Sequence, residues 1–241
     1  TGSPVIGLID SAGMRLQEAT DALNAFGEIY RRQVDASGVI PQITAIFGSC
    51  GGGLALFPTL TDFTFMEESK AKLFVNSPNA IEGNYTDKCD TASPQFQSAK
   101  AGIVDVVADE ETVYTEIRSL VSLLPSNNED SDSYEECTDD LNRTCDNLDG
   151  AIADTALALR QISDNGIFFE TKRSYAREMV TGFIRLNGAT VGAVGNRTAV
   201  FDENGEATEK FEPVLTAHGC EKAAAFIEFC DAFDIPILSL T

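Results

Sequence analysis

The stretch that most constrains this chain is GSCGGGLA, residues 48–55, in which four glycines surround one cysteine. It follows the apolar run ITAIF, residues 43–47, and leads into a short helical segment. A continuous apolar run is typical of a strand buried in a parallel sheet. A turn made of glycines leaves the backbone amides uncovered at the start of a helix. The sequence therefore predicts an α/β unit in which a phosphate, an oxyanion or the substrate of the cysteine approaches the main chain.

An earlier segment has the same order of elements. The apolar run SPVIGLID, residues 3–10, is followed by the loop SAGMR, residues 11–15, and by a helical pattern from about Gln17 to Ala36. The apolar residues of that pattern recur at helical spacing. We expect the first run to form a strand buried on both faces, as in a parallel sheet covered by helices. Alternating strands and helices predict an α/β fold with a mostly parallel sheet.

The remaining sequence predicts a second lobe after an acidic connector. GIVDVVA, residues 102–108, reads as a strand, and Asp109 is placed to cap the next helix. The polar segment that follows Pro125 carries no core of its own. Beyond it, Asn187-Gly188 between two β-rich runs is a strong hairpin signal. We therefore expect three parts, namely a first lobe over 1–124, a connector over 125–150 and the start of a second lobe over 151–241.

Composition narrows the classes of function. The formal net charge of −21 disfavours nucleic-acid binding, because phosphate backbones are bound by Lys and Arg. No apolar run has the length of a membrane span, and no signal peptide opens the sequence, so we expect a cytoplasmic protein. The six cysteines form no C-x-x-C motif, which disfavours a zinc ribbon, and we expect no metal.

The glycine stretch admits three kinds of chemistry. A P-loop requires Lys-Ser/Thr after the last glycine, where Leu54-Ala55 stands, and the dinucleotide spacing is absent. A cysteine nucleophile at Cys50 fits a strand–turn–helix elbow, and His218, the one histidine, would be its base. Alternatively, backbone amides of this turn and of the SAGMR loop converge on an oxyanion. The simplest alternative is that both loops are only tight turns.

Five stretches resemble biotin-dependent acyl-CoA carboxyltransferases, the family of the acetyl- and propionyl-CoA carboxylase β subunits and related decarboxylase subunits. They cover most of the chain in the order of the family: VIGLIDSAGMRLQEATDAL, ASGVIPQITAIFGSCGGGLALFPTLTDFTFM, SLLPSNN, YAREMVTGFIRLNGATVGAVGN and EKAAAFIEFCDAFDIPIL. The resemblance implies a crotonase-type fold with two homologous lobes, of which the chain holds the end of the first and the start of the second.

The resemblance also implies the site residues. The family's Asp-Ser-Gly-Gly-Ala-Arg stretch resembles the segment from Asp10 to Arg15, and its Cys-Ala-Gly-Gly stretch resembles Cys50 to Gly53. The backbone amides implied for the oxyanion hole are those of Gly13, Met14, Gly52 and Gly53. The residues implied to contact substrate are Ala12, Arg15 and Gly51. Ala12, Met14 and Gly51 depart from the usual pattern, so the acyl group can differ from that of the family's better-known members.

The activity implied is carboxyl transfer between carboxybiotin and an acyl-CoA. Biotin would be carried by a partner protein, with a biotin carboxylase as a further partner, in a homo-oligomer built as a trimer of dimers. Members of the family have further segments before and after the stretch that this chain covers, including a second oxyanion hole. Two alternatives stay open, which are a cysteine hydrolase using Cys50 and His218, and a non-catalytic structural lobe of a carboxylase complex.

Overall fold

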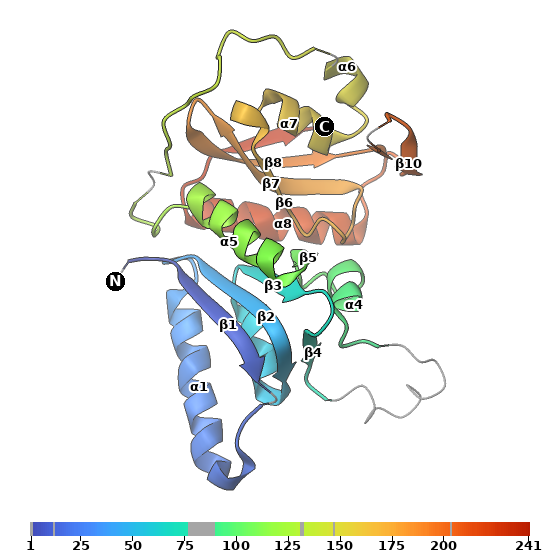
Figure 1. Ribbon diagram of the computed structural model, residues 1–241. Coiled ribbons are helices and arrows are strands. Elements are labelled where there is room, and N and C mark those ends of the chain that lie inside the picture. The colour runs from blue at the N-terminus through green and yellow to red at the C-terminus, as the bar shows by residue number, and fades with distance from the viewer. Residues whose placement is uncertain (1, 12, 77–89, 131–132, 147, 203) are drawn as a thin grey trace. The chain divides into compact units, whose positions relative to one another are not determined.

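The computed structural model describes the chain except residues 1, 12, 77–89, 131–132, 147 and 203 (Figure 1). The chain divides into two compact units, Thr1–Arg118 and Ser119–Thr241, and each is described by itself. The boundary falls inside helix α5 (Glu110–Leu123). None of the helices in the described part combines the length and hydropathy needed to cross a bilayer.

The first unit is built on a parallel sheet. Its strands are β1 (Val5–Ser11), β2 (Gln42–Gly51), β3 (Phe63–Glu67), β4 (Lys72–Phe74) and β5 (Val106–Ala108). The order in the sheet is β1-β2-β3-β5, β4 also pairs with β2, and every pairing is parallel. The helical elements are η1 (Leu16–Glu18), α1 (Ala19–Ala36), η2 (Gly52–Leu56), α2 (Phe57–Leu60), α4 (Pro94–Ala99) and the start of α5. The predicted α/β fold with a mostly parallel sheet is confirmed for this unit.

The core of the first unit lies on the central strands. Ile46 of β2, Met66 of β3 and Val104 are wholly buried and belong to one apolar cluster. Cys50, near the end of β2, is buried in the same cluster. The glycine turn that follows β2 therefore starts from a strand end that is packed into this core.

Strand β1 corrects one expectation from the sequence. It lies at the edge of the sheet and, among the described residues, pairs with β2 alone. Val5 and Leu8 are 52% and 58% exposed, and Ile9 is its one buried apolar side chain. The expected burial on both faces is therefore wrong for this strand. An apolar run reports hydrophobicity, whereas burial depends on which elements cover the strand.

The acidic cap of α5 is confirmed. The carboxylate of Asp109 accepts hydrogen bonds from the amides of Glu111 and Thr112, at 3.1 and 3.0 Å. These bonds occupy two of the amide groups that a helix leaves without partners at its start.

The second unit contains a mixed sheet of order β11-β8-β7-β6 and a two-stranded ribbon, β10-β9. Its strands are β6 (Phe168–Thr171), β7 (Met179–Leu186), β8 (Ala189–Asn196), β9 (Ala199–Phe201), β10 (Ala207–Lys210) and β11 (Ile237–Leu240). Its helical elements are α6 (Leu148–Ala151), α7 (Thr155–Ile162), η4 (Asp164–Gly166) and α8 (Ala217–Ala232). The predicted hairpin is confirmed, since β7 and β8 are antiparallel and Asn187 and Gly188 have φ of 50° and 81° between them.

The predicted connector, residues 125–150, falls within the second unit. Its residues touch the hairpin, because the amide of Glu135 donates to the carbonyl of Gly188 at 3.0 Å and the amide of Thr190 donates to the carbonyl of Ser133 at 3.2 Å. The division into lobes over 1–124 and 151–241 stays a prediction.

Candidate active site

Two loops of the first unit meet at one edge of its sheet. Because β1 and β2 are parallel, the loops that follow them leave from the same edge, and Ser11 pairs with Cys50 after a shift of register beyond Ile9. A Cβ placed on Gly13 would lie 3.2 Å from the carbonyl oxygen of Gly51. The backbone of the SAGMR loop therefore lies directly against the backbone of the glycine turn.

The glycine turn presents amides without side chains. Strand β2 stays extended through Gly51, with φ −118° and ψ 157°, and the chain turns at Gly52, whose φ is +65°. Among the described residues other than its chain neighbours, no atom lies within 4 Å of the place where a Cβ of Gly52 would stand. Gly52 and Gly53 open η2, so their amides have no acceptor within that turn. The turn offers two hydrogen-bond donors and open space beside Gly52, which suits an oxyanion.

The first glycine of the stretch has a different task. A Cβ on Gly48 would lie 2.1 Å from Oδ1 of Asp10, so a side chain there would have to displace this carboxylate. The same carboxylate accepts a hydrogen bond of 3.1 Å from the amide of Ser49. Gly48 therefore allows the side chain of Asp10 to pack against the end of β2. The amides that can contact an oxyanion are those of Gly52 and Gly53.

The SAGMR loop contains four of the predicted site residues, and the structure describes three of them. The amide of Gly13 lies 3.4 Å from Oγ of Ser11, a long contact that leaves it free to take a better acceptor. Met14 is half-buried beside it. Ala12 lies outside the described residues. The guanidinium of Arg15 is exposed and 3.2 Å from the carboxylate of Glu18, a surface ion pair that a phosphate can replace at small expense.

The environment of Cys50 does not favour a nucleophile. Its Sγ is wholly buried and donates to the carbonyl of Leu54 at 3.5 Å. Burial raises the pKa of the thiol to about 12, so the thiolate is scarce at neutral pH. His218 belongs to the second unit, where its exposed ring has Nδ1 2.8 Å from the hydroxyl of Tyr175. The cysteine-hydrolase alternative is therefore not favoured.

Two residues close to the glycine turn escaped sequence reasoning. They are Asp10, described above, and Tyr30 of α1, whose hydroxyl donates to the carbonyl oxygen of Gly53. The signal for Tyr30 was its spacing of four residues from Phe26, which places both rings on one helix face. That spacing does not say which segment the rings contact.

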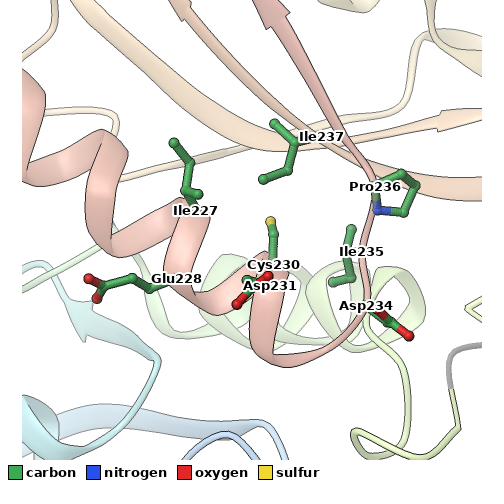
Figure 2. Close-up of a pocket in the computed structure, with 8 residues that line it drawn as sticks. All are labelled: Ile227, Glu228, Cys230, Asp231, Asp234, Ile235, Pro236 and Ile237. Atoms are coloured by element: carbon green, nitrogen blue, oxygen red, sulfur yellow. The ribbon is translucent and has the colours of Figure 1, made fainter.

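The second unit contains a hollow of its own. It has a volume of about 530 Å³ and lies between the end of α8 and the start of β11 (Figure 2). Figure 2 shows the carboxylates of Glu228, Asp231 and Asp234 along one side of it. Such a lining repels the phosphates of coenzyme A. Within the described part of the chain, no three His, Cys, Asp or Glu side chains form a group able to hold a metal ion.

The comparison with known families identifies the class of protein. Residues 1–241 match the family described as the carboxyl transferase domain, and the chain belongs to that family. This confirms the resemblance drawn from the sequence.

Individual members of the family are similar to this chain over nearly its whole length. The chain is 39% identical to the carboxyltransferase subunit of propionyl-CoA carboxylase from Haloferax mediterranei, over 99% of this chain and 46% of that protein. It is 35% identical to the α subunit of methylmalonyl-CoA decarboxylase from Propionigenium modestum, over 99% of this chain and 46% of that protein. The structure of a transcarboxylase 12S hexamer with methylmalonyl-CoA bound matches with a TM-score of 0.85 and 32% identity, over 100% of this chain and 47% of that one.

These relatives are about twice as long as the aligned region. The chain spans just under half the length of each of them. What the whole protein catalyses, and with which partners, is therefore a matter for proposal.

Proposed function

We propose that this chain is part of a carboxyltransferase subunit that moves a carboxyl group between carboxybiotin and an acyl-CoA. Family membership supports the reaction class, and the relatives named above act on propionyl-CoA and methylmalonyl-CoA by their names. The fold in this proposal is of the crotonase type, and the two units correspond to the end of one lobe and the start of a homologous one.

One observation carries the proposal, namely that the backbone of Gly13 lies against Gly51 where the amides of Gly52 and Gly53 have no acceptor in their turn. Loss of the α-proton, or of a carboxyl group, from an acyl-CoA leaves an electron pair that is delocalised onto the thioester oxygen. Amides that point at that oxygen stabilise the enolate more than the neutral thioester, which lowers the barrier in either direction. Gly13, Met14, Gly52 and Gly53 supply these donors.

The other predicted residues take supporting positions. Gly51 borders the thioester, and Arg15 exchanges Glu18 for a phosphate of coenzyme A. Ala12, which lies outside the described residues, is assigned to the substrate by the family resemblance alone. Biotin, held by a carrier protein with a biotin carboxylase as a further partner, supplies the activated carboxyl group when bound. We assign no residue of this chain to biotin. A trimer of dimers and a cytoplasmic location complete the proposal.

The test uses the full-length protein with the subunits that copurify with it. Radiolabelled malonyl-CoA and methylmalonyl-CoA serve as carboxyl donors and free biotin as acceptor. We expect Gly52→Ala to lower kcat at least about tenfold, because a Cβ at the turn disturbs the donors, and loss of one such donor costs about 10²–10³ in rate. Gly52→Val, with a larger side chain in the open space, should abolish transfer.

Gly205 provides a matched control. Its φ of +80° is also left-handed, and no atom of the described residues beyond its chain neighbours lies within 4 Å of its Cβ position, yet it belongs to the turn between β9 and β10. Gly205→Ala should cost the same backbone strain, about 1 kcal/mol, and leave kcat unchanged. Equal kcat values for Gly52→Ala and Gly205→Ala would overturn the oxyanion assignment. Tight binding of acyl-CoA without any transfer by the wild type would instead favour a structural lobe.

A further inference from the structure

Tyr30 joins helix α1 to the glycine turn. Its hydroxyl donates a hydrogen bond to the carbonyl oxygen of Gly53, which lies 23 residues further along the chain. A Cβ on Gly53 would stand 3.0 Å from that hydroxyl, so the phenol fills the place that a side chain would take. The turn is thus supported from the side of α1.

The ring of Tyr30 is itself held in place. It stacks on Phe26 with ring centroids 6.0 Å apart and meets the edge of Phe57 at 6.0 Å. Phe57 begins α2, directly after the 3₁₀ turn that starts at Gly52. The Tyr30 ring is therefore positioned by one ring of its own helix and one ring of α2.

The turn needs such support because three consecutive glycines have no side chains to fix their torsion angles. Two further bonds hold its flanks, from the amide of Ser49 to Asp10 and from Sγ of Cys50 to the carbonyl of Leu54. The bond from Tyr30 acts on Gly53 itself. The Gly53 carbonyl is coplanar with the amide of Leu54, whereas the Gly53 amide belongs to the preceding peptide group and is linked to that carbonyl through the φ and ψ torsions of Gly53. Anchoring the carbonyl therefore restrains the Gly53 amide through these two torsions, together with the bonds at Ser49 and Cys50.

We propose that Tyr30 is a positioning residue that holds the amides of Gly52 and Gly53 in the orientation that binds the enolate oxygen. This inference rests on the proposed function of the turn. Tyr30 acts through the backbone, since its proton is committed to the Gly53 carbonyl. Burial, and next the charge of a Cys50 thiolate, raise the pKa of Tyr30, so the phenol keeps this proton at neutral pH.

The test is Tyr30→Phe in the full-length protein, which removes one oxygen and keeps the ring. We expect kcat for carboxyl transfer to fall about five- to tenfold, while KM for the acyl-CoA stays within about twofold, because the donors act mainly on the transition state. Tyr114→Phe is the matched control. Tyr114 stacks on Phe47 with centroids 4.9 Å apart and is 41% exposed, so loss of its hydroxyl should change neither constant.

A second measurement reports on the turn without any catalysis. Cys50 is buried beneath the turn, so a loosened turn should expose its thiol. We expect N-ethylmaleimide to label Cys50 faster in Tyr30→Phe than in Tyr114→Phe, as measured by mass spectrometry of the Cys50 peptide. The double variant Tyr30→Phe/Gly52→Ala should be little slower than Gly52→Ala alone, since both changes act on one unit.

The outcomes separate the two proposals. If the wild type transfers carboxyl groups and Tyr30→Phe matches Tyr114→Phe in kcat, the positioning role of Tyr30 is overturned. Full additivity with Gly52→Ala, or a rise in KM that accounts for the whole loss, overturns it as well. If the wild type transfers no carboxyl group to or from any acyl-CoA tested, the proposed function fails. Unchanged labelling of Cys50 would then show that Tyr30 does not hold the turn at all.

Discussion

At the scale of single residues, Asp62 makes stability depend on pH. Burial, and then the negative charge of Asp105, raise the pKa of Asp62 to about 6, although its carboxylate accepts a 2.7 Å hydrogen bond from the amide of Gln42. A raised pKa means that the folded chain binds this proton more tightly than the unfolded chain. The stability that the proton confers is present at about pH 4 and is lost as the pH rises through 6.

Asp62→Asn should therefore stabilise the protein at pH 8 by about 1–3 kcal/mol and change little at pH 4, because the amide oxygen keeps the bond from Gln42 without the buried charge. Urea unfolding of both proteins at the two pH values measures the difference. Glu28→Gln, at an exposed position on α1, is the control and should be neutral at both. A variant of Asp62 that is less stable at pH 8 than the wild type would refute this account.

Some residues of the candidate site could be predicted from the sequence, and others could not. The positions of Gly52 and Gly53 after a buried strand could be predicted, because strand, turn and helix are local features with clear residue preferences. The contribution of Tyr30 could not, since it depends on which segment packs under α1, more than twenty residues away in sequence. The burial of Cys50 is also tertiary, and it is burial that disfavours a nucleophile there.

At the scale of elements, the β7–β8 hairpin depends on one glycine. A Cβ on Gly188 would lie 2.0 Å from the carbonyl oxygen of Glu135, and its φ is +81°. The amides of Asn187 and Gly188 both donate to the carboxylate of Asp164, at 3.1 and 2.6 Å. Gly188→Ala should therefore lower the free energy of unfolding by at least about 2 kcal/mol, from backbone strain together with displacement of Glu135.

Thermal or urea unfolding checks this prediction, with Gly150→Ala as the control. Gly150 lies in helix α6, and beyond that helix's own backbone no atom of the described residues lies within 4 Å of its Cβ position, so that variant should be neutral or more stable by up to about 1 kcal/mol. Equal stability of the two variants would show that the hairpin does not depend on Gly188.

The elements also show why some predictions succeeded and one failed. The hairpin and the capped helix α5 were predictable because Asn-Gly and an acidic cap act within a few residues. The failure was β1, where the same kind of apolar run as in β2 gave an edge strand with exposed side chains. The two strands have similar residue patterns, but the elements that cover each strand are determined by the rest of the fold. The burial of a strand therefore could not be predicted from its own residues.

At the scale of the whole molecule, the family could be identified from sequence because several long stretches agree in order, and the match over residues 1–241 confirms it. Neither the order of stretches nor the fold identifies the acyl group. Ala12 and Met14 depart from the usual pattern in the stretch that the resemblance assigns to the substrate, so they are the first places to look for a difference in substrate.

The charge of the whole chain leads to the last prediction. With 38 acidic and 17 basic residues, the formal net charge is −21, and like charges on the folded surface repel one another. Raising NaCl from about 10 to about 150 mM shortens the screening length from about 30 to about 8 Å. If this repulsion opposes folding by about 1 kcal/mol, Tm should rise by about 2–4 °C. Sucrose at the same osmolality raises stability without screening charges. The rise in Tm produced by NaCl should therefore exceed the rise produced by sucrose at pH 8. The difference between the two should shrink towards pH 5, where carboxylates begin to be protonated. A Tm that is insensitive to salt at pH 8 would mean that the acidic side chains are far enough apart, or well enough paired, for their repulsion to be negligible.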